Sequence, residues 1–187
     1  MMSTISTIKM TAHQFLELGE DPVGVRLELV NGKVAVSPSP TPDHSYVDSM
    51  LRHLLISHVK ARDLGQIYGD VDTIFGPHDV RRPDVIFFAK NRLHLISNKA
   101  MEGPPDLCVE ILSPSSAKTD RADRFEQYRG GGVGHYWIID PDQRTVDGYK
   151  LQDGLYALAG RGKASDTVCL PPFPDLPIPL AELWRPK

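Results

Sequence analysis

The chain of 187 residues has little of several features that mark large classes of protein. It has only two cysteines, Cys108 and Cys169, which form no metal-binding spacing, so reduced thiols are expected. No apolar run approaches the ~20 residues that span a bilayer, and residues 1–8 lack the apolar core of a signal peptide. These observations predict a cytoplasmic protein without a membrane segment.

An excess of charge of one sign is also missing. The 21 Lys and Arg residues against 24 Asp and Glu residues give a formal net charge of −3. Because a mildly negative molecule repels phosphate, any binding to nucleic acid must come from a local basic patch. The length fits one domain over residues 1–187, and neither an internal repeat nor a linker divides the chain.

Local signals predict an α/β (α+β) fold in which two main helices pack on a mixed sheet. Thr11 and Gln14 form a capping box for a short helix, and Asn31-Gly32 predicts a type I′ turn between two strands. Thr41 and Pro42 begin a long helix. Strands are expected at 26–30, 33–37, 66–69, 71–75, 84–88, 107–112, 135–139, 145–151 and 155–159, and a second long helix from 119 or 120 to 129.

A carboxylate near the centre of an apolar strand is the most informative feature of the chain. Residues 107–112 are apolar except for Glu110, and an ionised Glu there is costly unless a metal, a cation or several donors hold it. Asp84 begins another apolar strand, far enough upstream for the two strands to be neighbours. Two such acids suit Mg²⁺ and phosphodiester hydrolysis. The alternative is a buried Glu110 that pairs with an arginine.

The order and spacing of several short motifs resemble the PD-(D/E)XK nuclease superfamily. The two main motifs are Arg82-Pro83-Asp84-Val85 and the segment 105–115, PDLCVEILSPS; weaker matches lie at 28–32, 39–44, 120–128 and 132–141. More narrowly, the chain resembles a bacterial branch of restriction-endonuclease-like proteins that is often labelled a domain of unknown function. The likeness extends from about Thr11 to Trp184, and it implies a restriction-endonuclease-like mixed β-sheet flanked by helices.

The resemblance also implies roles for individual residues. Asp84 and Glu110 would bind Mg²⁺, with Mn²⁺ as a substitute, and the backbone carbonyl of Ile111 is a candidate third ligand. Glu28 would be an additional acid near the metal. For Glu28 the alternative is an exposed position in the hairpin.

The chain departs from the superfamily pattern at the lysine. The usual position holds Leu112, and the branch carries its lysine on the following helix, where this chain has Arg124. Arg124 lies four residues after Asp120 and four before Tyr128, so the three share one helix face. An arginine can stabilise phosphate charge but cannot deprotonate the attacking water. Lys118 is a candidate replacement, with an exposed loop lysine as the alternative.

Three residues are candidates for contact with nucleic acid. His44 lies at the start of the long helix, where anions are favoured, although a surface histidine is the alternative. Lys118 and Arg121 belong to a basic segment beside the proposed site, and such residues contact phosphates without reading sequence. Solvated surface charge would explain them equally well.

Three hypotheses follow from the sequence. The first is a metal-dependent endonuclease that hydrolyses DNA, and a two-strand cut would favour a homodimer. The second is a nuclease-like fold that acts as a nucleic-acid or protein binding module without turnover, motivated by Arg124 and the negative net charge. The third is an ion pair between Glu110 and Arg124 that serves stability alone.

Overall fold

Two sheets form the framework of the computed structural model, which describes residues 9–37, 39–113 and 119–186, without the side chains of residues 119–121. The larger sheet is mixed, with strand order β10-β9-β8-β7-β6-β3, and only its β7–β8 pair is parallel. Its strands are β3 (Gly65–Tyr68), β6 (Val85–Ala89), β7 (Leu107–Ile111), β8 (His135–Asp140), β9 (Thr145–Gln152) and β10 (Leu155–Lys163).

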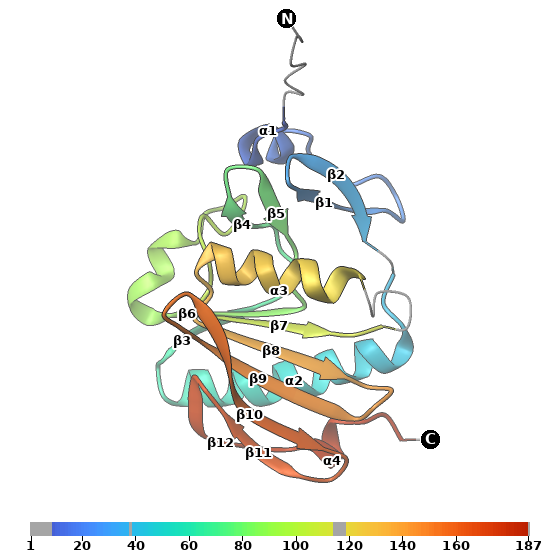
Figure 1. The fold of residues 1–187 in the computed structure, drawn as a ribbon, viewed down its shortest axis with the longest axis vertical. Coiled ribbons are helices and arrows are strands. Elements are labelled where there is room, and N and C mark those ends of the chain that lie inside the picture. The colour runs from blue at the N-terminus through green and yellow to red at the C-terminus, as the bar shows by residue number, and fades with distance from the viewer. Residues whose placement is uncertain (1–8, 38, 114–118, 187) are drawn as a thin grey trace, which may run out of the picture.

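The smaller sheet is antiparallel, with strand order β2-β1-β5-β4. It consists of β1 (Arg26–Val30), β2 (Lys33–Ser37), β4 (Thr73–Gly76) and β5 (Asp79–Arg81). A separate hairpin near the C-terminus joins β11 (Thr167–Leu170) to β12 (Phe173–Pro179). The helices are α1 (Ala12–Leu16), α2 (Pro42–Ala61), α3 (Thr119–Gly131) and α4 (Leu180–Leu183), with a 3₁₀ helix at Lys90–Leu95. Figure 1 shows α3 between the smaller sheet and β7.

The local signals in the sequence act as predicted. The Thr11 side chain accepts a hydrogen bond from the Gln14 amide, and the Gln14 side chain completes the capping box. Asn31 and Gly32 have φ angles of 52° and 79°, as a type I′ turn requires, and they fix the register of β1 against β2. Thr41 caps α2. The hairpin and the start of α2 are therefore confirmed.

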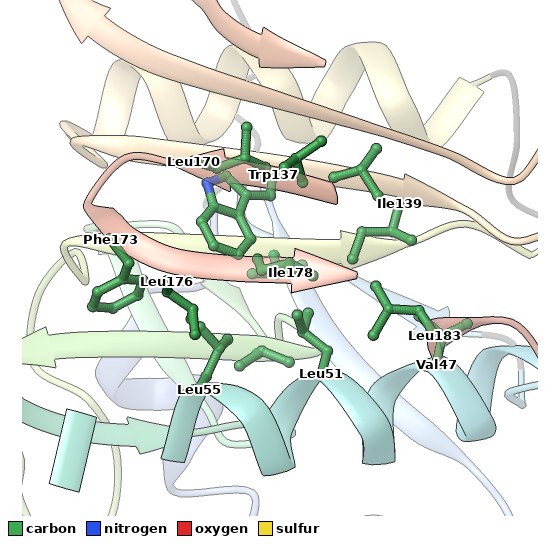
Figure 2. Packing of buried hydrophobic residues seen from close by; sticks show 14 of the residues in the cluster. Val47, Leu51, Leu55, Trp137, Ile139, Leu170, Phe173, Leu176, Ile178 and Leu183 are labelled. Atoms are coloured by element: carbon green, nitrogen blue, oxygen red, sulfur yellow. The ribbon is translucent and has the colours of Figure 1, made fainter. Parts of the chain in front are cut away.

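The apolar face of α2 packs beneath the larger sheet. Val47, Leu51 and Leu55 of α2 belong to one buried cluster with alternate residues of β7, namely Leu107, Val109 and Ile111. Figure 2 shows this cluster closed by the β11–β12 hairpin and by Trp137 and Ile139 of β8. Because side chains alternate along a strand, Cys108 and Glu110 face the opposite side, where α3 lies. This alternation directs Glu110 toward α3.

Some elements differ from the sequence-based expectation. The short β5 is polar at both ends and gave no strand signal, and β12 forms in a proline-rich tail because its two-stranded sheet leaves edge positions for proline. Helix α3 ends at Gly131, two residues beyond the expected end at 129, and the next residue, Gly132, has a φ of 82° that suits the left-handed position after a helix. None of the helices in the described ranges combines the length and apolar character needed to cross a bilayer.

Candidate active site

Asp84 and Glu110 lie at the same end of two neighbouring antiparallel strands. Val85 of β6 is opposite Val109 of β7, and continuing this register by one residue places Asp84 opposite Glu110. Asp84 Oδ2 accepts a hydrogen bond of 2.7 Å from the Ile111 amide, and Oδ1 lies 3.1 Å from His44 Nε2. The Asp84 side chain is therefore held in one orientation from two sides.

Helix α3 brings two partners to the Glu110 carboxylate. Arg124 Nη1 donates to Glu110 Oε1 at 3.0 Å, and the fully buried Tyr128 hydroxyl donates to the same oxygen. Arg124 and Tyr128 are one helical turn apart, as their spacing predicted. Among the described residues both hydrogen bonds to Glu110 reach Oε1, which leaves Oε2 available to another ligand.

Glu28 reaches the same cluster from β1. Its side chain is only 3% exposed, so the alternative of an exposed hairpin residue is wrong. Arg124 Nη2 donates to Glu28 Oε2 at 3.1 Å, Arg81 Nη1 donates to the same atom at 2.9 Å, and the Arg82 amide donates to Oε1 at 3.1 Å. Arg124 thus bridges the carboxylates of Glu28 and Glu110.

The two glutamates respond to burial in opposite ways. Burial and the neighbouring Asp84 raise the pKa of Glu110 to about 7, although Arg124 and the Tyr128 hydrogen bond oppose this rise. Burial also disfavours the ionised form of Glu28, but the guanidinium groups of Arg124 and Arg81 outweigh it and lower the pKa of Glu28. The neighbouring cations therefore outweigh the cost of burying the negative charge of Glu28, but they do not outweigh that cost for Glu110.

His44 is part of the site rather than a surface residue. Its side chain is 12% exposed, so the alternative of a surface histidine is wrong. Burial disfavours the charged imidazole, but the hydrogen bond to Asp84 and the Asp84 charge outweigh this effect and raise the pKa of His44. Thr41, which caps α2, fixes the first turn of the helix from which His44 projects.

A small cavity of about 50 Å³ lies between these residues. Its lining includes the side chains of the site and residues of the hairpin and of the segment before β6, namely Asp84, Glu110, Arg124, His44, Arg26, Ser37 and Arg82. About three or four water-sized groups fit in such a volume. The cavity therefore joins the acidic pair to polar residues of the β1–β2 hairpin.

The acidic pair fits a hard divalent cation. Within the described ranges, no group of three His, Cys, Asp or Glu side chains is arranged to hold a metal ion by itself. Mg²⁺ does not require such a group, because it is commonly held by one or two carboxylates and completes its shell with waters and substrate oxygens. Asp84 and Glu110 face one cavity, and the high pKa of Glu110 indicates a carboxylate with too little positive charge around it.

Other candidates from the sequence have different positions. Lys118 lies outside the described residues, and Arg121 lies in α3 at a position whose side chain is not described. Arg82, the first residue of the motif that contains Asp84, pairs with Asp72 at 2.7 Å and also with Asp21. The charge of Arg82 is thus compensated inside the protein.

Sequence reasoning did not identify Arg81 or Tyr128 as direct partners of the acidic residues. Arg81 belongs to β5, a strand that no local pattern predicted, so nothing in the sequence indicated its contact with Glu28. Tyr128 was placed on the face of Arg124 by its spacing, and that spacing was the available sign of its contact with Glu110.

Comparisons with known proteins show the family and the fold of the chain. The structure is similar to the crystal structure described as "a putative nuclease belonging to DUF820" from Anabaena variabilis, with a TM-score of 0.77 and 26% sequence identity over 94% of this chain and 97% of that chain. The comparison with curated proteins found no match. The family model "Uma2: Putative restriction endonuclease" matches residues 12–181. The chain therefore belongs to the Uma2 family, with the restriction-endonuclease-like fold that the sequence motifs predicted.

Proposed function

We propose that the protein is a metal-dependent endonuclease that hydrolyses phosphodiester bonds of DNA, with Mg²⁺ as its cofactor and Mn²⁺ as a substitute. The observation that carries this proposal is the position of Asp84 and Glu110, which come from neighbouring strands and line one cavity. Membership of the Uma2 family supports the same reaction class.

The proposed metal ligands are Asp84 and Glu110, with the Ile111 carbonyl as a candidate third. Asp84 keeps its orientation through the Ile111 amide and His44, and Glu110 offers Oε2 while Arg124 and Tyr128 hold Oε1. A divalent cation bound there would polarise the phosphate and make an attacking water more acidic.

Arg124 is proposed to stabilise the negative charge that develops on the phosphate. It lines the cavity and stays protonated at any pH at which the protein is folded, so it acts as a fixed charge and not as a base. Glu28 holds Arg124 in this position, and both Glu28 oxygens already accept hydrogen bonds from Arg81, Arg82 and Arg124. We therefore propose Glu28 as a positioning residue rather than a metal ligand.

Nicking of supercoiled plasmid with Mg²⁺ or Mn²⁺ tests the proposal. We expect the wild type to nick the plasmid and Glu110→Gln to be inactive, because the neutral amide is a poor ligand for a hard cation. Glu126→Gln is the matched control, since it makes the same change on the exposed face of α3.

Retained nicking by Glu110→Gln would refute the site assignment. The absence of nicking by every variant, on double-stranded and single-stranded DNA, would instead favour the binding module without turnover.

A further inference from the structure

Two buried nitrogen atoms without a hydrogen-bond partner belong to residues that line one cavity. Within the described part of the chain, these atoms are Arg26 Nε and His44 Nδ1, and both residues line the cavity that holds Asp84 and Glu110. Buried polar groups are nearly always hydrogen-bonded, so an unpaired one needs an explanation. Because both residues line one cavity, a ligand or a water bound there would supply the missing partners.

The hairpin directs Arg26 to the site. Arg26 and Glu28 are two residues apart on β1, so their side chains leave the same face of the strand, and Glu28 reaches Arg124 from that face. Arg26 is opposite Ser37 of β2, which also lines the cavity. The end of the hairpin therefore brings a guanidinium and a hydroxyl group to the cavity that the two carboxylates line.

Arg26 differs from the other arginines of the cavity in how its charge is compensated. Arg82 pairs with two carboxylates, those of Asp72 and Asp21, and Arg124 bridges Glu28 and Glu110. Arg26 pairs through Nη2 with Asp70, whose side chain is 55% exposed, and its Nε has no acceptor among the described residues. Arginine is always protonated, so this Nε–H is a donor that requires an acceptor.

We propose that Arg26 binds a phosphodiester oxygen of the DNA strand at the cavity that Asp84 and Glu110 also line. The guanidinium presents planar donors to phosphate oxygens, which suits Arg26 better than a lysine would. His44 Nε2 faces the Asp84 carboxylate, so Nδ1 is the ring nitrogen left to contact the same group or a water beside it. This inference deepens the proposed function and rests on it for the identity of the ligand.

DNA binding without cleavage tests the role of Arg26. Fluorescence anisotropy of a labelled DNA duplex, measured with protein carrying Glu110→Gln, separates binding from hydrolysis. We expect Arg26→Gln to weaken binding about tenfold and to reduce the slope of log K against log salt by about 0.9, the amount expected for one lost phosphate contact.

Two variants distinguish this role from a structural one. Asp70→Asn removes the ion pair of Arg26 but keeps its guanidinium, so it should bind DNA at least as tightly as the parent. Arg26→Lys keeps the charge but lacks the Nε donor, so part of the affinity should be lost. Circular dichroism confirms that each variant is folded.

The proposal is overturned if Arg26→Gln binds with the affinity and salt slope of the parent, if Asp70→Asn loses as much affinity as Arg26→Gln, or if no variant binds DNA. Plasmid nicking by the wild type is scored separately. A protein that binds DNA through Arg26 but never nicks it would keep this inference and reject the nuclease.

Discussion

Substitution of Arg124 by methionine removes a cation that contacts two buried carboxylates. Glu28 keeps the Arg81 guanidinium at 2.9 Å and the Arg82 amide at 3.1 Å, so it remains paired. Glu110 keeps only the Tyr128 hydroxyl among its described partners. The substitution therefore leaves Glu110 as a buried acid without a cation, and it should bind a proton more tightly.

The size of the effect depends on pH. With Arg124 present, the pKa of Glu110 is about 7, above its ordinary value of 4.5, and burial is the main cause. Arg124 lowers this pKa, so its loss raises the pKa further. A raised carboxyl pKa destabilises the folded state as pH rises through the unfolded value toward the folded one, because the unfolded chain releases its proton first.

The difference in free energy of unfolding between Arg124→Met and the wild type follows from the direction of this pKa shift. Below pH 7 folded Glu110 is protonated in both proteins, so the Glu110 contribution to the difference vanishes. Above pH 7 only the variant keeps the proton, and its free energy of unfolding should fall behind the wild type by about 1.4 kcal/mol per pH unit. The deficit stops growing once the pH passes the pKa of Glu110 in the variant, and its upper limit is the cost of breaking a buried ion pair, about 3 to 5 kcal/mol.

Urea denaturation of wild type, Arg124→Met, Glu110→Gln and the double variant at pH 6 and pH 9 measures this effect. The double variant should lack the pH-dependent loss, because glutamine does not titrate. An Arg124→Met protein whose deficit is the same at both pH values would refute the assignment of Glu110 as the carboxylate that Arg124 compensates.

Three further outcomes are expected. Arg124→Lys should nick plasmid faster than the wild type because lysine can lose its proton; an equal or lower rate would show that the arginine does not limit cleavage. Tyr128→Phe should raise the pKa of Glu110 above 7 and lower the free energy of unfolding by about 2 kcal/mol, measured by NMR titration and urea denaturation. Mn²⁺ affinity should fall about tenfold per pH unit below pH 7 as Glu110 binds a proton, and a flat calorimetric profile would contradict this.

The parts of the fold with strong local signals could be predicted from the sequence. Asn31-Gly32 determined a hairpin because both residues tolerate positive φ, and the apolar spacing of α2 identified its buried face. The β5 strand is only three residues long and pairs with the distant β1, so its own sequence did not mark it. The β11–β12 hairpin is local, but the prolines of β12 are atypical of a strand and concealed it.

The acidic residues of the candidate site could be predicted from the sequence, but the partners that compensate their charges could not. Glu110 stood out because its strand is otherwise apolar, and the register of β6 against β7 places Asp84 across from it as the spacing allowed. The sequence left open whether Arg124 faces a phosphate or a carboxylate, and the structure contains the Glu110–Arg124 ion pair that was one of the alternatives. That pair uses Oε1, so it is compatible with a cation on Oε2.

Arg26 illustrates what sequence alone could not supply. It has no motif, and its place at the cavity follows from the pairing of β1 with β2 and from the position of this hairpin beside α3. Figure 1 shows the hairpin and α3 on the same side of β7. Only the assembled fold places Arg26 at the cavity that Asp84 and Glu110 line.

The central claim is that Asp84 and Glu110 bind one divalent cation, and calorimetric titration with Mn²⁺ at pH 8 measures it most directly. The account predicts one bound Mn²⁺ per chain in the wild type and in Glu126→Gln, and none in Asp84→Asn or Glu110→Gln. Mn²⁺ binding that is unchanged in Asp84→Asn and Glu110→Gln, or undetectable in the wild type, would contradict it.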